Sequence, residues 1–527
     1  MATGPSRAQL LLGLLLTLAG LVVAGAGMAP DLDGPWQRGW KAHNGGRYAH
    51  IARNYARWGF THAGGAPVLD VAQASGQPAS ESSPDLYAHH PPGVMMLTGL
   101  FFRAFGVSER VARLLSFGAT LASLAMLALL VGTVFGPLAG GAAALLCGAM
   151  PMTAVFGTHV EVQGPLVLLC GLTILWAYAR LLASGGGTGW WLVWFAALAA
   201  GSWCDWFGLY YGAGCAVHAL VTRRGWGKAL LLGSGVAGCF ASVLAWLSSL
   251  PGMSWRRVFR AAGLRVDGGV GVTDGAMGQA LGTWFSTSLE LMPAWPLCLG
   301  VVLILGFCPL GSRGTRRLGV AGLLWLLVLP PVVHGLLFPA GLLLHSYWLF
   351  AMPAALAAGL GVALCAGAQR GGRGGREGLA AFAALVLLAL GTAGLVSAVE
   401  QAREELDPLP ALLGQALAQN TAVGDGVLTN FEVNLLWPGM DVGQYIVSRP
   451  EISYYADRPI RGGVRGQRAA RAVDLAEARR LLPSSRWFLL WPDPADPELA
   501  QALEAVGGLA RLELNSDPPV LLYGLAP

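Results

Sequence analysis

Long apolar stretches recur through residues 1–399, and most have the length of a membrane-spanning helix. An α-helix needs about 20 predominantly apolar residues to cross the hydrocarbon core. The stretch at 93–106 is too short, and it is predicted to lie on the membrane surface. The longer windows predict eleven transmembrane helices, at 8–28, 113–134, 137–157, 162–183, 189–205, 206–222, 229–249, 290–310, 318–338, 347–367 and 378–399.

The first of these windows has two interpretations. Residues 8–28 resemble the apolar core of a secretory signal peptide, which would be cleaved. They lead, however, into further apolar spans, and the match to a small-residue cleavage site is loose. Residues 8–28 are therefore interpreted as the first transmembrane helix.

Basic residues set the predicted orientation, because short cytoplasmic loops are enriched in Lys and Arg. With the amino terminus inside, the loops at 223–228, 313–317 and 370–376 all face the cytoplasm. A membrane span at 93–106 would place all three outside. The long loop that begins at Asp31 and the carboxy-terminal segment then share the outer side. This pattern predicts a multi-pass membrane protein whose polar groups face the outer side, away from the cytoplasm.

The carboxy-terminal segment differs in composition from the rest, since charge and proline content rise after Val399. Its pattern predicts helices at 407–419, 474–482 and 497–506, and strands at 425–430, 444–448, 487–491 and 518–523. The predicted fold is a polytopic α-helical membrane domain, residues 1–399, followed by a soluble periplasmic α/β domain, residues 400–527.

Composition agrees with a membrane protein and excludes other classes. Hydrophobic residues make up 54% of the chain and charged residues only 12%, against about 25% charged in soluble domains. The cytoplasmic loops account for most of the net charge of +5, so no nucleic-acid partner is predicted. All eight cysteines lie in or beside apolar spans, which indicates no disulfide framework.

The first outer loop, with the surface stretch after it, covers residues 31–110 and is rich in polar chemistry. Residues 47–58 alternate apolar positions with a basic face at helical spacing, which predicts a helix at the lipid headgroup boundary. Histidines with nearby carboxylates raise the alternative of a divalent cation, although no fixed ligand spacing occurs. The candidate cation ligands are His43, His50, His89 and His90.

At these residues the chain resembles a known family. The segment Arg47-Tyr48-Ala49-His50-Ile51-Ala52-Arg53-Asn54, the His-Pro-Pro turn ending at Pro92 and the stretch Phe105 to Arg113 resemble membrane glycosyltransferases of the GT-C class. These include protein O-mannosyltransferases and lipid A aminoarabinose transferases. The resemblance covers residues 1–370. It implies an inverting transferase that moves a hexosyl or pentosyl group from a polyprenyl-phosphate carrier in the bilayer to a glycan, lipid or protein acceptor.

Such a transfer needs a carboxylate that accepts the proton of the attacking group. The relatives carry an acidic pair just before the Arg-Tyr-Ala segment, but this chain reads His43-Asn44-Gly45-Gly46 there. The remaining candidates are Asp33 or its neighbour Asp31, Asp85 and Glu161. Asp33 is the first choice. Each has a structural alternative, as a helix cap, a loop residue or a turn residue.

The transfer also needs cations or hydrogen-bond donors that stabilise the departing phosphate. Arginine suits phosphate oxygens because its guanidinium can donate two parallel hydrogen bonds. An acid at a membrane edge, such as Asp205, is a functional candidate by default. The structural alternatives are a charge cluster facing lipid headgroups for the arginines and His345, an ordinary interfacial histidine for His89 and His90, and a buried structural acid for Asp205. The predicted substrate- and phosphate-binding residues are Arg47, Arg53, His89, His90, Arg103, His345 and Asp205.

Two other classes of function remain as alternatives. A transporter or flippase of a lipid-linked saccharide would also have many spans, although transporters usually place ionisable residues near the bilayer midplane. A GT-C relative that has lost catalysis and acts as a scaffold would explain the missing acidic pair. Transfer activity in vitro separates these alternatives from the enzyme.

Overall fold

The computed structural model describes residues 5–36, 40–69, 86–87, 90–184, 187–222, 225–250, 253–256, 258–259, 282, 314–338, 346–370, 409–421, 426–429, 447–448, 454–455, 460–462, 485–490, 509–514 and 520–525. Most of the described chain is helical, and the described strands all lie beyond residue 425.

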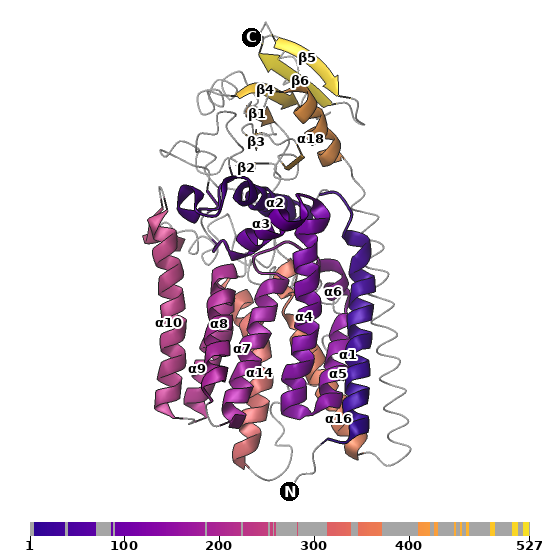
Figure 1. Ribbon diagram of the computed structural model, residues 1–527, viewed down its shortest axis with the longest axis vertical. Coiled ribbons are helices and arrows are strands. Elements are labelled where there is room, and N and C mark those ends of the chain that lie inside the picture. Colours follow the sequence, from indigo (N-terminus) through magenta and orange to yellow (C-terminus); the bar gives the residue numbers. More distant parts are fainter. Residues whose placement is uncertain are drawn as a thin grey trace.

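The described helices of the first 370 residues form a bundle in which most lie roughly side by side (Figure 1). Four of them are long and apolar enough to cross a membrane: Arg7–Asp31, Glu109–Phe135, Pro165–Ala183 and Trp226–Ser249. The bundle helices are α1 (Arg7–Met28), α4 (Glu109–Phe135), α5 (Pro137–Gly148), α7 (Pro165–Ser184), α8 (Thr188–Cys204), α9 (Gly208–Val221), α10 (Trp226–Ser249), α14 (Gly314–Leu337) and α16 (Met352–Arg370).

These helices overlap most of the predicted spans, with one correction. The single span predicted at 137–157 is wrong: α5 ends at Gly148, and a separate short helix, α6 (Pro151–Phe156), begins at Pro151. Proline lacks a backbone N–H and suits the first position of a helix, so a new helix begins there. The predicted spans at 290–310 and 378–399 lie outside the described residues.

Small residues allow α1 and α5 to approach closely. Gly13 and Gly20 of α1 face Gly141 and Gly148 of α5, and a Cβ atom added to Gly20 would lie 2.7 Å from the backbone oxygen of Ala144. Close contacts of this kind between small residues stabilise helix pairs in membranes, where lipid is as apolar as the side chains. The packing places α1 as an integral member of the bundle.

We expect Gly20→Val to destabilise the protein by about 1–3 kcal/mol, because the added atoms would push the two helices apart. The same change at Gly25 is the matched control, since a Cβ there would meet only Phe117, at 3.9 Å. Thermal unfolding of both variants in detergent measures the difference. Equal melting temperatures would contradict the close packing of α1 on α5.

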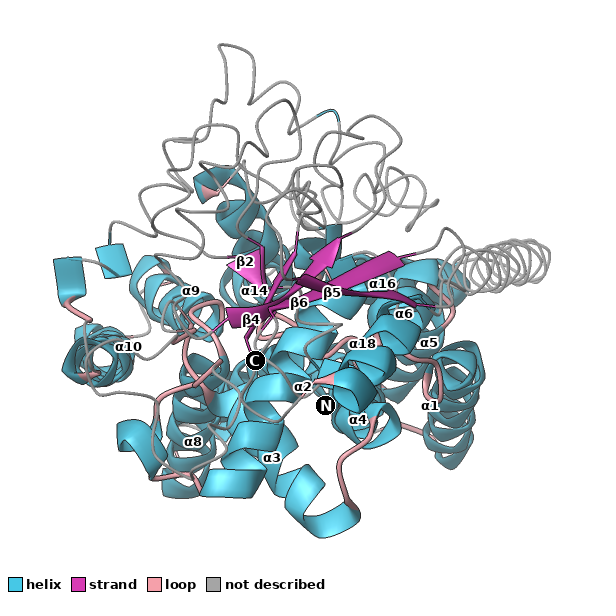
Figure 2. Cartoon of the chain, turned by 90° about the horizontal axis from the view of Figure 1, so that it is seen from above, coloured by secondary structure: helices cyan, strands magenta, loops and turns pink. Residues whose placement is uncertain are grey.

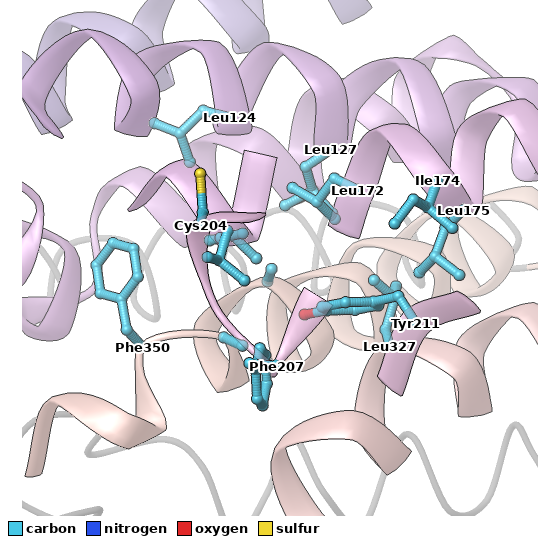
Figure 3. Close-up of a cluster of buried hydrophobic side chains, with 14 of the residues drawn as sticks. Leu124, Leu127, Leu172, Ile174, Leu175, Cys204, Phe207, Tyr211, Leu327 and Phe350 are labelled. Atoms are coloured by element: carbon cyan, nitrogen blue, oxygen red, sulfur yellow. The ribbon is translucent and has the colours of Figure 1, made fainter. Parts of the chain in front are cut away.

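The core of the bundle is a continuous apolar cluster (Figure 3). Leu124 and Leu127 of α4, Leu172 of α7 and Tyr211 of α9 all contribute buried side chains to it. The cluster fixes the helices against one another, and it therefore fixes the loops at their ends.

Two further helices lie across one end of the bundle, α2 (Trp40–Trp58) and α3 (Gly93–Phe105) (Figure 1). They pack directly on each other, because a Cβ atom on Gly99 of α3 would lie 2.9 Å from the backbone oxygen of Ala52. The prediction that 93–106 does not cross the bundle agrees with this position. Every residue from Tyr48 to Tyr55 is buried in protein, so this part of the helix predicted at the headgroup boundary faces protein and not lipid.

The carboxy-terminal segment forms a sheet beyond α2, seen from above in Figure 2. The strand order is β2-β3-β1-β4-β6-β5, with β1 parallel to β3 and β4 and with β6 antiparallel to β4 and β5. The elements are α18 (Leu409–Asn420), β1 (Gly426–Thr429), β2 (Val447–Ser448), β3 (Ile460–Gly462), β4 (Ser485–Leu490), β5 (Leu509–Leu514) and β6 (Val520–Leu525).

The first predicted helix and all four predicted strands of this segment overlap described elements, α18, β1, β2, β4 and β6. The helices predicted at 474–482 and 497–506 lie outside the described residues. Strands β3 and β5 were not predicted.

The ends of the bundle differ in chemistry. The helix ends that flank the three basic loops, in α9, α10, α14 and α16, lie at the same end as the amino terminus (Figure 1). Helices α2 and α3 and the sheet lie at the opposite end. The separation of polar groups expected from the basic loops is therefore present in the fold.

Candidate functional site

Glu161 is the centre of a buried polar cluster beneath α2. It lies in the turn between α6 and α7, and only 2% of the residue is exposed. Its Oε2 atom accepts a hydrogen bond of 2.6 Å from the amide of Asn44, and its Oε1 atom accepts one of 2.9 Å from the Tyr48 hydroxyl. The backbone N–H of Val162 also donates to Oε1, at 2.8 Å. These three donors match an ionised carboxylate, whose oxygens only accept.

Helical spacing explains why α2 supplies two of these donors. Asn44 and Tyr48 are four residues apart, so they lie on the same face of the helix. The Tyr48 hydroxyl also lies 2.8 Å from the hydroxyl of Tyr87. Because the single proton of Tyr48 is directed at Glu161, Tyr87 is the donor in this second bond. A hydrogen-bonded chain therefore runs from Tyr87 through Tyr48 to Glu161.

A second buried acid, Asp205, lies in the turn between α8 and α9 and is fully buried. One of its oxygens is 2.7 Å from Nδ1 of His90, and the other accepts a bond of 2.8 Å from the backbone N–H of Phe207. Burial alone would raise the pKa of Asp205. The hydrogen bond and charge of His90, together with the Phe207 N–H and the charge of His334, outweigh burial, so that the pKa falls below its ordinary value.

Tyr87 connects the two acids. Its ring stacks on the ring of His90, with centroids 5.8 Å apart, and its hydroxyl bonds Tyr48. The guanidinium of Arg47 lies 5.5 Å from the centroid of the Tyr87 ring. The site thus joins two buried carboxylates, a histidine and an arginine through one tyrosine, and it can both accept a proton and bind an anion.

The arginines and histidines of α2 contact one another. Arg47 Nη2 lies 2.5 Å from Nε2 of His43, and Arg53 Nη2 lies 3.1 Å from Nδ1 of His50. A ring nitrogen that accepts from a guanidinium does not ligate a metal at the same time. Among the residues that the structure describes, no group of three or more His, Cys, Asp or Glu side chains gathers to hold an ion. The divalent cation stays a prediction.

The other predicted residues are not part of the described cluster. Asp33 is 68% exposed in its side chain and pairs with Arg110 at 3.5 Å. Its neighbour Asp31 accepts from the Thr158 hydroxyl. Arg103 is exposed at the end of α3, 5.7 Å from the ring centroid of Phe60. Asp85, His89 and His345 lie outside the described residues.

The sequence analysis missed several residues of the cluster. Asn44 and Tyr48 hold Glu161, but the helix predicted from the sequence began at Arg47 and so left Asn44 outside it. His334 of α14 was also missed. Its Nε2 atom lies 3.2 Å from the side-chain amide of Gln163, and Gln163 follows Glu161 by two residues. The rings of Phe207, Tyr210, Phe338 and Trp348 surround His334 at centroid distances of 4.6 to 5.6 Å. No local motif marks His334.

Comparisons with known proteins concern the fold and the family of the chain. No curated protein sequence matches the chain. Residues 89–248 match the family model described as dolichyl-phosphate-mannose-protein mannosyltransferase. The crystal structure of ArnT from Cupriavidus metallidurans bound to undecaprenyl phosphate is similar, with a TM-score of 0.63, 15% identity and coverage of 98% of each chain.

The oligosaccharyltransferase AglB from Archaeoglobus fulgidus, in complex with an inhibitory peptide and a dolichol-phosphate, is similar with a TM-score of 0.57 and 13% identity. That alignment covers 97% of this chain and 74% of AglB. The chain has the GT-C fold. The resemblance in fold to GT-C membrane glycosyltransferases that the sequence indicated is therefore confirmed. The residues that match the family model include His90, Glu161 and Asp205.

Proposed function

We propose that this protein is an inverting glycosyltransferase that moves a sugar from a polyprenyl-phosphate carrier to an acceptor. The observation that carries the proposal is the Glu161 carboxylate, buried within the GT-C fold and held by Asn44 and Tyr48 of α2. The likeness to a protein bound to undecaprenyl phosphate and to one bound to a dolichol-phosphate supports a carrier of this class.

In this proposal Glu161 accepts the proton of the attacking acceptor group. A sugar phosphate leaves as an anion and needs little acid assistance, so the base is the main requirement. A buried carboxylate acts in a low-dielectric environment, where its charge has a larger effect than in water. Glu161 is favoured over Asp33 because Asp33 is largely exposed and faces Arg110.

His90 and Arg47 are proposed to stabilise the departing phosphate. Both contact the Tyr87 ring, whose hydroxyl bonds Tyr48, the donor to Glu161. Preorganised cations stabilise a phosphate as its negative charge increases in the transition state. This arrangement would place the proton acceptor and the anion site at opposite ends of the chain Glu161–Tyr48–Tyr87.

We further propose that the reaction takes place on the periplasmic face of a bacterial inner membrane. The amino terminus and the basic helix ends lie at the opposite end of the bundle from α2 (Figure 1). The positive-inside rule assigns this basic end to the cytoplasm. The carrier would then reach the site laterally from the outer leaflet, and a hexosyl or pentosyl group would pass to a glycan, lipid or protein acceptor.

The test is transfer by the purified full-length protein in proteoliposomes that contain undecaprenyl-phosphate-linked sugars, one sugar at a time, with radiolabel in the sugar. Labelled acceptor, with equimolar release of undecaprenyl phosphate, is the expected result. Movement of the intact labelled lipid between leaflets without cleavage would favour the transporter. Binding of the lipid with neither transfer nor movement would favour the scaffold.

A further inference from the structure

Two residues of the carboxy-terminal segment, Tyr454 and Tyr455, contact the first loop and α2. The backbone N–H of Trp36 donates to the Tyr455 hydroxyl at 2.7 Å, across 419 residues of sequence. Arg53 of α2 donates to the backbone oxygen of Tyr454 at 2.8 Å, across 401 residues. Both tyrosines are packed against the main apolar core of the bundle.

Trp36, which donates to the Tyr455 hydroxyl, also packs against α2. It is almost fully buried, and the edge of the Tyr454 ring meets it at a centroid distance of 6.1 Å. The guanidinium of Arg113, from α4, lies 4.3 Å from the centroid of the Trp36 ring. On the α2 side the Trp36 ring occupies the space that a Cβ atom of Gly45 would need. Trp36 is therefore fixed between α4, α2 and Tyr454.

The Tyr455 hydroxyl accepts from Trp36 as a neutral group. Burial raises the pKa of Tyr455, and the Glu109 carboxylate at the start of α4 raises it further, so the hydroxyl keeps its proton at neutral pH. The contact with the first loop is therefore the hydrogen bond from the Trp36 N–H.

These contacts reach α2 at two points, on either side of Tyr48. Gly45, next to Asn44, lies on the Trp36 ring, and Arg53 is bonded directly to Tyr454 and is also 3.1 Å from His50. Asn44 and Tyr48 of the same helix each donate a hydrogen bond to the Glu161 carboxylate. A shift of α2 would therefore move both donors away from Glu161.

We propose that Tyr454 and Tyr455 are positioning residues for the Glu161 site: by fixing Trp36 and Arg53 they hold α2 so that Asn44 and Tyr48 face the carboxylate. This inference rests on the proposed function of Glu161. It assigns the carboxy-terminal segment a part in the chemistry, in addition to any role in acceptor binding. The guanidinium of Arg53 is then a structural contact of α2 and not a ligand of the carrier phosphate.

The test is Tyr455→Phe in the full-length protein, which removes only the hydroxyl. Because small misplacements of catalytic groups have large effects on rate, we expect kcat to fall by about tenfold while KM for the carrier changes less than about twofold. In a protein that already carries Tyr48→Phe, Tyr455→Phe should lower kcat by less than about twofold, because both substitutions weaken the same support of Glu161. Tyr523→Phe, which removes a tyrosine hydroxyl from β6 of the same segment, controls for loss of a hydroxyl elsewhere, and its kcat should exceed that of Tyr455→Phe.

Hydrogen exchange gives a readout that does not depend on transfer. Tyr455→Phe should speed amide exchange in residues 43–56 and leave α7 unchanged. Unchanged exchange in α2, or an unchanged kcat with a raised KM for the acceptor, would overturn the positioning role. If the wild type shows no transfer, the proposed function fails, and the exchange experiment still tests whether Tyr455 holds α2.

Discussion

Replacing Glu161 with Gln should lower the rate of sugar transfer by about 10²–10³-fold, within the range usual for loss of a general base. Gln keeps the shape of the side chain and an oxygen that can accept from Tyr48, but it cannot take a proton from the acceptor. The carrier phosphate binds elsewhere in the proposed site, so KM for the carrier should change little. Steady-state kinetics with a polyprenyl-phosphate sugar measures both quantities.

Asp33→Asn separates the two carboxylates that the sequence left as candidates. If Glu161 is the base, Asp33→Asn removes only an exposed pair with Arg110, which contributes about 0–1 kcal/mol to stability, and transfer should continue. If Asp33→Asn abolishes transfer and Glu161→Gln does not, the assignment to Glu161 is wrong. Melting temperatures of both variants show whether a loss of rate comes from misfolding.

A smaller change tests the support of Glu161. Tyr48→Phe removes one of the three donors to the carboxylate and breaks the connection to Tyr87. The effect on kcat should be smaller than that of Glu161→Gln, because Asn44 and Val162 still hold the side chain. This ordering distinguishes a supporting hydroxyl from the proton acceptor itself.

Much of the fold follows from the sequence because membrane helices are fixed by length and apolarity. The windows that became α1, α4, α7 and α10 were found from these properties alone. The end of the bundle at which Glu161 and Asp205 lie followed from the basic loops, since charge asymmetry reports sidedness directly. The break at Pro151 was missed because proline is common enough in membrane helices to leave the boundary ambiguous.

The partners within the site could not be predicted, because they come from distant parts of the chain. Arg47 and Arg53 share a predicted helix and were both assigned to the carrier phosphate, yet Arg53 donates to the backbone oxygen of Tyr454, 401 residues away. That contact contributes to the burial of α2. Asn44 was not singled out, because the carboxylate to which it donates, Glu161, lies 117 residues later.

His90→Leu should destabilise the protein by about 3–5 kcal/mol, because it leaves the buried Asp205 without its nearest ionic partner. The double variant His90→Leu, Asp205→Leu should recover much of this loss, since apolar pairs often replace buried ion pairs without cost. Thermal unfolding in detergent at neutral pH measures the comparison. A double variant less stable than His90→Leu alone would contradict an ionised Asp205.

The pH dependence of folding stability in the same variants gives a second test, because the expected trend has opposite signs with and without His90. In the wild type the pKa of Asp205 is lowered, so its stabilising effect is present above the ordinary aspartate pKa of about 3.9 and is lost as the pH falls through the lower folded value. Without His90, burial, the largest single cause, is opposed only by the Phe207 N–H and the charge of His334, so we expect that pKa to be raised and folding to take up a proton. Stability contributed by Asp205 is then lost as the pH rises.

Variants that also carry Asp205→Asn separate the contribution of Asp205 to stability from the contributions of His334 and Tyr210. Both of these residues interact electrostatically with Asp205. The difference in melting temperature between wild type and Asp205→Asn should shrink as the pH falls below about 4. The corresponding difference in the His90→Leu background should move in favour of aspartate as the pH falls from 7. Parallel slopes in the two backgrounds would mean that His90 does not set the charge of Asp205, and the anion site proposed at His90 would lose its support.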